Sequence, residues 1–149
     1  MADGRRIAPA LARTLLSARS VMRTPTGPTV LAVEDHAAER RLIYHALKDH
    51  VRLIEAGDAA SAIELLGREP VALVLLDLHL PPDTGSPREG LEIERHVRQL
   101  PRDVPVVVVS ADDDPLLSQA LLERGVRAVL RKPVDPERLR ALVVELLGT

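Results

Sequence analysis

From residue 29 onward, short apolar runs alternate with longer stretches whose apolar residues recur at helical spacing. Runs that stay apolar almost to their last residue are typical of strands buried on both faces of a sheet. Such runs fall at 29–34, 51–55, 71–77, 104–110 and 126–131. The stretches between and after them predict helices at 37–49, 58–66, 89–100, 115–124 and 136–147.

Residues that cap helices support these boundaries. Asp58 and Asp135 stand where a helix N-cap is expected, and Pro136 follows at a first helical position. Gly67 and Gly125 stand where two of the helices are expected to stop. Strands and helices in strict alternation predict a parallel sheet covered on both faces, the doubly wound α/β class. An eight-fold barrel is excluded, because it needs roughly 250 residues.

A basic segment precedes this pattern. Residues 7–22 have the spacing of a short amphipathic helix, and the breaker-rich stretch 24–28 predicts a linker. Three interpretations stay open: a disordered tail, a docking or membrane-surface helix, and an artefact of start-codon choice. We favour a dispensable tail at 1–27, because isolated helices of this length are marginal in water. The folded domain is then expected at 28–149.

Composition narrows the possible functions. The absence of cysteine excludes disulfides, thiolate zinc sites and a cysteine nucleophile. With a formal net charge of −2 and Tyr44 as the one aromatic residue, the chain has no nucleic-acid footprint and no base-stacking platform. No apolar run reaches the roughly 18 residues of a membrane span, and no secretory signal follows the first arginines. We therefore expect a cytoplasmic protein that binds neither nucleic acid nor membrane.

Polar residues follow four of the five apolar runs. Glu34 ends the first and Asp35 follows it, Asp77 ends the third, Ser110 ends the fourth and Lys132 follows the fifth. In doubly wound sheets the carboxyl ends of the strands line the ligand site, so these side chains are expected to converge. Three carboxylates suit Mg²⁺, and a carboxylate beside such an ion can attack phosphorus. Lys132 and Ser110 would then hold phosphoryl oxygens, which predicts phosphoryl transfer.

In these segments the sequence resembles the receiver domain of two-component response regulators. The matching segments are VLAVEDH, LVLLDLHLP, VVVVSA and LRKPV, and the resemblance covers about residues 28–147. It implies a flavodoxin-like fold of five β–α units with strand order 2-1-3-4-5.

The resemblance also implies a role for each matching acidic position. Asp77 is similar to the phosphoacceptor aspartate and Asp35 to the direct Mg²⁺ ligand. Glu34 is similar to the second acidic residue, which reaches the metal largely through water. The backbone carbonyl of His79 stands where the family completes the metal shell.

The remaining matches concern the phosphoryl group. Ser110 is similar to the switch hydroxyl, Ala111 to the small neighbour that keeps the phosphoryl group accessible, and Lys132 to the family's lysine. Pro133 is expected to follow a cis peptide bond, which is uncommon enough to be checked.

The sequence departs from the family pattern in two places. The connection from Asp77 to Gly90 is longer than usual, and Val129 stands where the family has a switch Tyr or Phe. The usual aromatic rotamer coupling therefore cannot operate. His79 and Asp112 occupy positions that border the path of hydrolytic water in the family, which implies an effect on phosphoryl lifetime.

The five histidines, at 36, 45, 50, 79 and 96, share no metal-ligand spacing. Exposed helix histidines are usually solvated, so we assign none of these imidazoles a role in metal binding. His36 or Asp35 is a candidate cap for the helix that follows.

The resemblance implies a phosphoacceptor and not an enzyme that turns over other substrates. A sensor histidine kinase or a histidine phosphotransfer protein would phosphorylate Asp77. Output would pass to a protein partner or onward along a relay. The family's output face, here about 115–147, is also where a homodimer could form.

Two alternatives stay open. Haloacid-dehalogenase phosphatases use a similar Asp, Ser or Thr, Lys and Mg²⁺, but they need a second acid two residues after the nucleophile, where this chain has His79. A phosphorylation-independent interaction domain would have lost part of the site, whereas the acidic pair, Asp77, Ser110 and Lys132 are all present.

Overall fold

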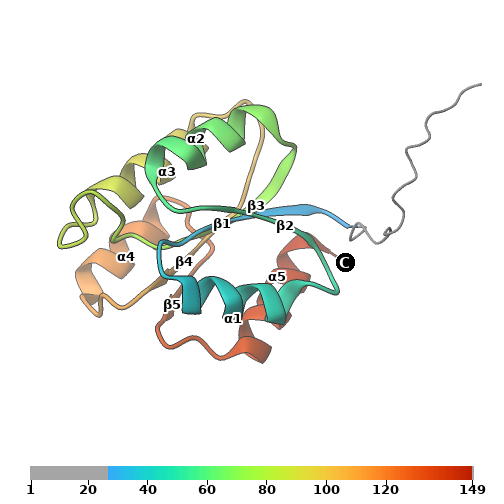
Figure 1. Cartoon of the computed structure of the whole chain (residues 1–149). Coiled ribbons are helices and arrows are strands. Elements are labelled where there is room, and N and C mark those ends of the chain that lie inside the picture. Colours follow the sequence, from blue (N-terminus) through green and yellow to red (C-terminus); the bar gives the residue numbers. More distant parts are fainter. Residues whose placement is uncertain (1–26, 149) are drawn as a thin grey trace, which may run out of the picture.

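The computed structural model describes residues 27–148 (Figure 1). The tail predicted at 1–27 lies outside these residues apart from Gly27, so the division into a tail and a domain stays a prediction.

Strands and helices alternate along the described chain, as the hydrophobic pattern predicts. The strands are β1 (Thr29–Val33), β2 (Arg52–Ala56), β3 (Val71–Leu76), β4 (Val106–Ser110) and β5 (Ala128–Arg131). The helices are α1 (Ala37–Leu47), α2 (Ala59–Arg68), α3 (Arg88–Arg98), α4 (Pro115–Glu123) and α5 (Pro136–Leu147).

The strands form one parallel sheet in the order β2-β1-β3-β4-β5. Helices α1 and α5 cover one face of this sheet, and α2, α3 and α4 cover the other (Figure 1). This is the expected doubly wound, flavodoxin-like fold. The strand order reverses between β1 and β3, which is where such folds place their ligand site.

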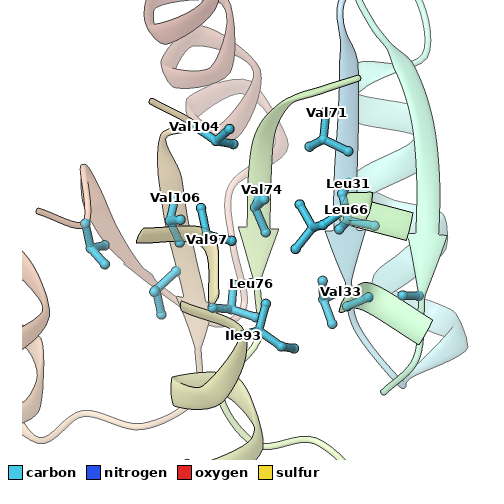
Figure 2. Packing of buried hydrophobic residues seen from close by; sticks show 14 of the residues in the cluster. Leu31, Val33, Leu66, Val71, Val74, Leu76, Ile93, Val97, Val104 and Val106 are labelled. Atoms are coloured by element: carbon cyan, nitrogen blue, oxygen red, sulfur yellow. The ribbon is translucent and has the colours of Figure 1, made fainter. Parts of the chain in front are cut away.

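Alternate residues of the central strands face opposite layers of the core. Val30 and Ala32 of β1 belong to the cluster that includes residues of α1 and α5, whereas Leu31 and Val33 belong to the other. Figure 2 shows this second cluster, in which side chains from the strands meet Ile93 of α3. Because both faces are covered, the central strands carry polar side chains only where they end.

Most of the predicted helix caps are confirmed. Asp58 accepts a hydrogen bond from Ser61 N–H at the start of α2, Asp135 caps α5, and Gly125 follows α4 with φ +105°. The prediction that α2 stops at Gly67 is wrong. The helix continues to Arg68 and ends at Glu69, which is extended because the next residue is Pro70.

Gly90 lies against the segment that follows β3. Its N–H donates to the carbonyl of Leu78 (3.2 Å), and a Cβ at this position would lie 2.7 Å from that oxygen. Leu78 follows Asp77 directly, so this close approach fixes where the start of α3 lies relative to the strand end.

We expect Gly90→Ala to lower the free energy of unfolding by about 1–3 kcal/mol, because the added methyl group meets backbone that cannot move aside freely. Gly67→Ala is the matched control. It lies in a helix with no atom within 4 Å of the new methyl group, so stability should rise by up to about 1 kcal/mol. Urea unfolding followed by circular dichroism measures both. A Gly90→Ala protein as stable as the wild type would show that the backbone of Leu78 moves aside without loss of stability.

Candidate functional site

The site residues are held by sheet hydrogen bonds that extend past the strands. The N–H of Glu34 donates to the last carbonyl of β2 (2.9 Å), and that of Asp77 to the last carbonyl of β1 (3.0 Å). The N–H of Lys132 donates to the last carbonyl of β4 (3.0 Å). The backbone therefore places these three side chains at one edge of the sheet, as the sequence predicts.

The ammonium of Lys132 lies among three carboxylates. Its Nζ is 2.8 Å from Glu34 Oε1, 2.9 Å from Glu39 Oε1 and 3.1 Å from Asp77 Oδ2. Glu34 and Asp77 are only 2% and 5% exposed, whereas Glu39 lies nearer the surface. A buried carboxylate needs a partner of opposite charge, and Lys132 serves two of them at once.

The pKa values of these groups follow from burial and from this sharing. Burial raises the pKa of Glu34 above its usual value despite the nearby ammonium. Burial opposes the charge of Lys132, but hydrogen bonds to Glu34 and Glu39 outweigh it and raise the pKa of Lys132. Burial also opposes the charge of Glu39, yet hydrogen bonds with Lys132 and Glu34 lower its pKa. Lys132 therefore stays charged.

The acidic residues fit a divalent cation. Asp77 Oδ1 accepts the N–H of His79 (3.2 Å), and Asp35 Oδ1 is buried without a hydrogen-bond partner. Potential ligand atoms of Glu34, Asp35, His36 and Asp77 lie within 4.8 Å of one another. An unpartnered buried carboxylate oxygen is costly unless a cation satisfies it, and hard carboxylate oxygens are what Mg²⁺ prefers.

An imidazole spans the opening of the site. His79 Nε2 lies 3.2 Å from Asp112 Oδ2, and His79 Nδ1 lies 3.1 Å from the carbonyl oxygen of Thr84. Hydrogen bonds from the Asp114 N–H and from His79 lower the pKa of Asp112. The two positions that the family resemblance singles out are thus in direct contact. Thr84, from the lengthened connection before α3, lines the same opening.

Of the two residues at the carboxyl end of β4 that are expected to lie near the phosphoryl group, one is buried and the other is exposed. Ser110 is buried, and its Oγ accepts a hydrogen bond from the Asp112 N–H (3.0 Å). Ala111 is exposed and lines the opening with Asp77 and Lys132.

The expected cis peptide bond before Pro133 is present, and a second one, before Pro82, was not foreseen. Val129 is half-buried and packs against the core cluster shown in Figure 2. Its position within β5 agrees with the sequence prediction.

Sequence reasoning missed Glu39 and misjudged His36. Glu39 lies in the first turn of α1, and an acid in that turn so soon after an acidic pair was the available signal. His36 is the N-cap residue of α1, but its side chain makes no capping hydrogen bond. Its ring instead faces the carboxylates of Glu34 and Asp35.

The chain matches the family model of the response regulator receiver domain over residues 30–144. It belongs to the response regulator receiver family. Among solved structures, it is similar to the signal receiver domain of a LuxO repressor protein from Vibrio parahaemolyticus. The TM-score is 0.74 at 26% identity, with 83% of this chain and 92% of that one covered.

The chain matches part of one curated relative and most of another. The response regulator RpfG of Xanthomonas campestris pv. campestris, a cyclic di-GMP phosphodiesterase, is 32% identical over 126 residues, which are 81% of this chain and 32% of that protein. The two-component response regulator ORR5 of rice (Oryza sativa subsp. japonica) is 32% identical over 124 residues, which are 80% of this chain and 89% of that protein. The chain therefore spans about a third of the first relative's length.

Membership in this family makes the chain a signalling domain of the two-component type. Receiver domains receive phosphoryl groups from histidine kinases and typically bind Mg²⁺. Within residues 27–148, we find no helix with the length and apolar character needed to cross a bilayer.

We expect Lys132→Ala to cost roughly 3 kcal/mol of stability at neutral pH, because it leaves Glu34 and Asp77 buried without their cation. The pKa of Glu34, which burial already raises, would then lie further above its unfolded value. A carboxyl with a raised folded pKa favours the folded state more as the pH falls, so the deficit should shrink on acidification.

Urea unfolding between about pH 5 and pH 8, with chelator present, measures this deficit. Lys48→Ala, which removes an exposed lysine at the end of α1, is the control and should change little. A deficit that does not vary with pH would mean that Lys132 stabilises the fold through the packing of its stem.

Proposed function

We propose that the chain is a phosphoacceptor in a two-component system or phosphorelay, with Asp77 as the acceptor. The observation that carries this proposal is the convergence of Asp77, the Lys132 ammonium and the unpartnered Asp35 Oδ1 at one opening. The donor is a phosphohistidine on a sensor histidine kinase or a histidine phosphotransfer protein. The site lies in the cytoplasm, and neither nucleic acid nor membrane takes part.

In the reaction, a carboxylate oxygen of Asp77 attacks phosphorus while the P–N bond of the phosphohistidine breaks. The bond electrons leave with the imidazole of the donor, and an acyl phosphate forms on Asp77. Asp35, Asp77 and the His79 carbonyl would hold Mg²⁺, with Glu34 acting through water, and the ion would supply charge that offsets the phosphoryl oxygens. The residues of this chain provide position and electrostatic complementarity.

Lys132 and Ser110 receive the transferred group. The Lys132 ammonium lies 3.1 Å from Asp77 Oδ2, so it would lie close to an oxygen of a phosphoryl group on Asp77. The Ser110 oxygen already accepts a hydrogen bond from the backbone, so its own proton is free to be donated to another phosphoryl oxygen. Ala111 leaves the opening unobstructed.

Output passes through a downstream protein partner, through a second copy of the chain, or by onward transfer of the phosphoryl group. The face formed by α4, β5 and α5 suits the first two routes. It carries Leu116, which is 78% exposed, and Leu122, which is 50% exposed, both on α4. Large exposed apolar side chains on one helix are a common feature of interaction surfaces.

With acetyl phosphate and Mg²⁺, we expect the intact mass to rise by one phosphoryl group, and Asp77→Asn to abolish the increase. Asp83→Asn, in the exposed connection before α3, is the matched control and should be labelled normally. Labelling that survives Asp77→Asn would refute the acceptor assignment. No labelling of the wild type would favour a phosphorylation-independent interaction domain.

We expect Asp35→Asn to weaken Mg²⁺ binding about tenfold or more, and Glu34→Gln to weaken it less. Asp35 Oδ1 makes no hydrogen bond, whereas Glu34 is already engaged by Lys132. Amide shifts followed during Mg²⁺ titration give both affinities. Equal losses would show that the assignment of Asp35 as the direct ligand is wrong.

A further inference from the structure

His36 turns its imidazole toward the acidic edge of the site. Its Nδ1 lies 3.1 Å from Glu34 Oε2, 3.3 Å from Asp35 Oδ1 and 3.3 Å from Glu39 Oε1. Its backbone N–H donates to Glu34 Oε2 (3.2 Å), which fixes the start of the side chain beside the acidic pair. The ring is therefore part of the site, although it follows no metal-binding spacing in the sequence.

The position of this nitrogen suits a metal ligand. Ligands that are neighbours around an ion at about 2.1 Å lie about 3 Å apart, close to the separations between His36 Nδ1 and the carboxylate oxygens. A ring nitrogen of His36 is also one of the four ligand atoms within 4.8 Å of one another, together with atoms of Glu34, Asp35 and Asp77. Asp35 Oδ1, which faces it, is the buried oxygen without a hydrogen-bond partner.

Two other roles for the imidazole explain the geometry less well. A capping role fails, because the side chain makes no hydrogen bond to the first turn of α1. The imidazole does share a hydrogen bond with Glu34 Oε2 (3.1 Å), but Lys132 already binds the other oxygen of Glu34 and lies closer to Glu39, so this bond is not needed to offset either charge. At the same time, 66% of the His36 side chain is exposed, so the ring can turn without disturbing the core.

An imidazole changes which cations such a site prefers. Mg²⁺ takes oxygen ligands almost exclusively, whereas imidazole nitrogen binds the later divalent first-row ions well. We propose that His36 Nδ1 adds a nitrogen ligand to the cation site of Asp35 and Asp77, so that a divalent transition ion binds there in preference to Mg²⁺. This inference rests on the proposed cation site and concerns its selectivity.

The test compares Co²⁺ with Mg²⁺, by calorimetric titration of the full chain, in the wild type and three variants. We expect His36→Ala to lower the ratio of Co²⁺ to Mg²⁺ affinity about tenfold or more. His45→Ala removes an exposed imidazole of α1 outside the cluster and should leave the ratio unchanged. Asp35→Asn should weaken the binding of both ions.

A second measurement identifies the ligand directly. In the proton NMR spectrum of the Co²⁺ complex, a coordinated imidazole gives a hyperfine-shifted, exchangeable N–H signal. That signal should be present in the wild type and in His45→Ala and absent in His36→Ala. The proposal is overturned if His36→Ala leaves the affinity ratio or the signal unchanged, or if Co²⁺ binding does not depend on Asp35.

Labelling of the wild type at Asp77 with Mg²⁺ is measured separately. If Asp77 is labelled but Co²⁺ selectivity does not depend on His36, only this inference fails. If selectivity depends on His36 but Asp77 is never labelled, the phosphoacceptor function fails and the selective cation site stands.

Discussion

The burial of two carboxylates beside one ammonium is the interaction on which the rest of the site depends. Glu34 and Asp77 lie at the end of an apolar sheet, where an isolated negative charge would be strongly disfavoured. Lys132 offsets this cost, and its raised pKa shows that the carboxylates stabilise the ammonium in return. The positive charge is nevertheless shared among three acids, so the edge retains a negative excess. Such an edge suits a divalent cation, which would offset most of the excess.

The sheet explains why this charge arrangement is possible. Neighbouring strands continue their hydrogen bonds one residue beyond their ends, so Glu34, Asp77 and Lys132 have fixed backbone positions. Residues that approach from loops lack that constraint and are held by their own contacts. His79 binds both Asp112 and the Thr84 carbonyl, which joins the lengthened connection before α3 to the loop after β4. Thr84 of that lengthened connection therefore lines one side of the opening.

Much of the fold and of the site could be predicted from the sequence because both follow from regular patterns. Apolar runs locate the strands, and the polar residues at the ends of four of them locate the site. Helix α2 continues past Gly67, where the sequence predicts its end, because a helical glycine does not by itself end a helix, whereas Pro70 forces the residue before it, Glu69, out of the helical conformation. Glu39 and the imidazole of His36 were missed for a different reason. Their contacts depend on side-chain conformations at the start of α1, which no spacing rule specifies.

Because Val129 is not aromatic, the loop after β4 is a better candidate than β5 for transmitting a change at the site. Val129 is β-branched, has few χ1 states and packs into the core, so it offers little movement within β5. Ser110, by contrast, is tied to that loop through the Asp112 N–H. Asp112 in turn accepts the N–H of Asp114, which caps α4 by accepting the N–H of Leu116. A Ser110 side chain drawn toward a phosphoryl group would therefore pull on a continuous series of hydrogen bonds that ends at an exposed leucine of α4.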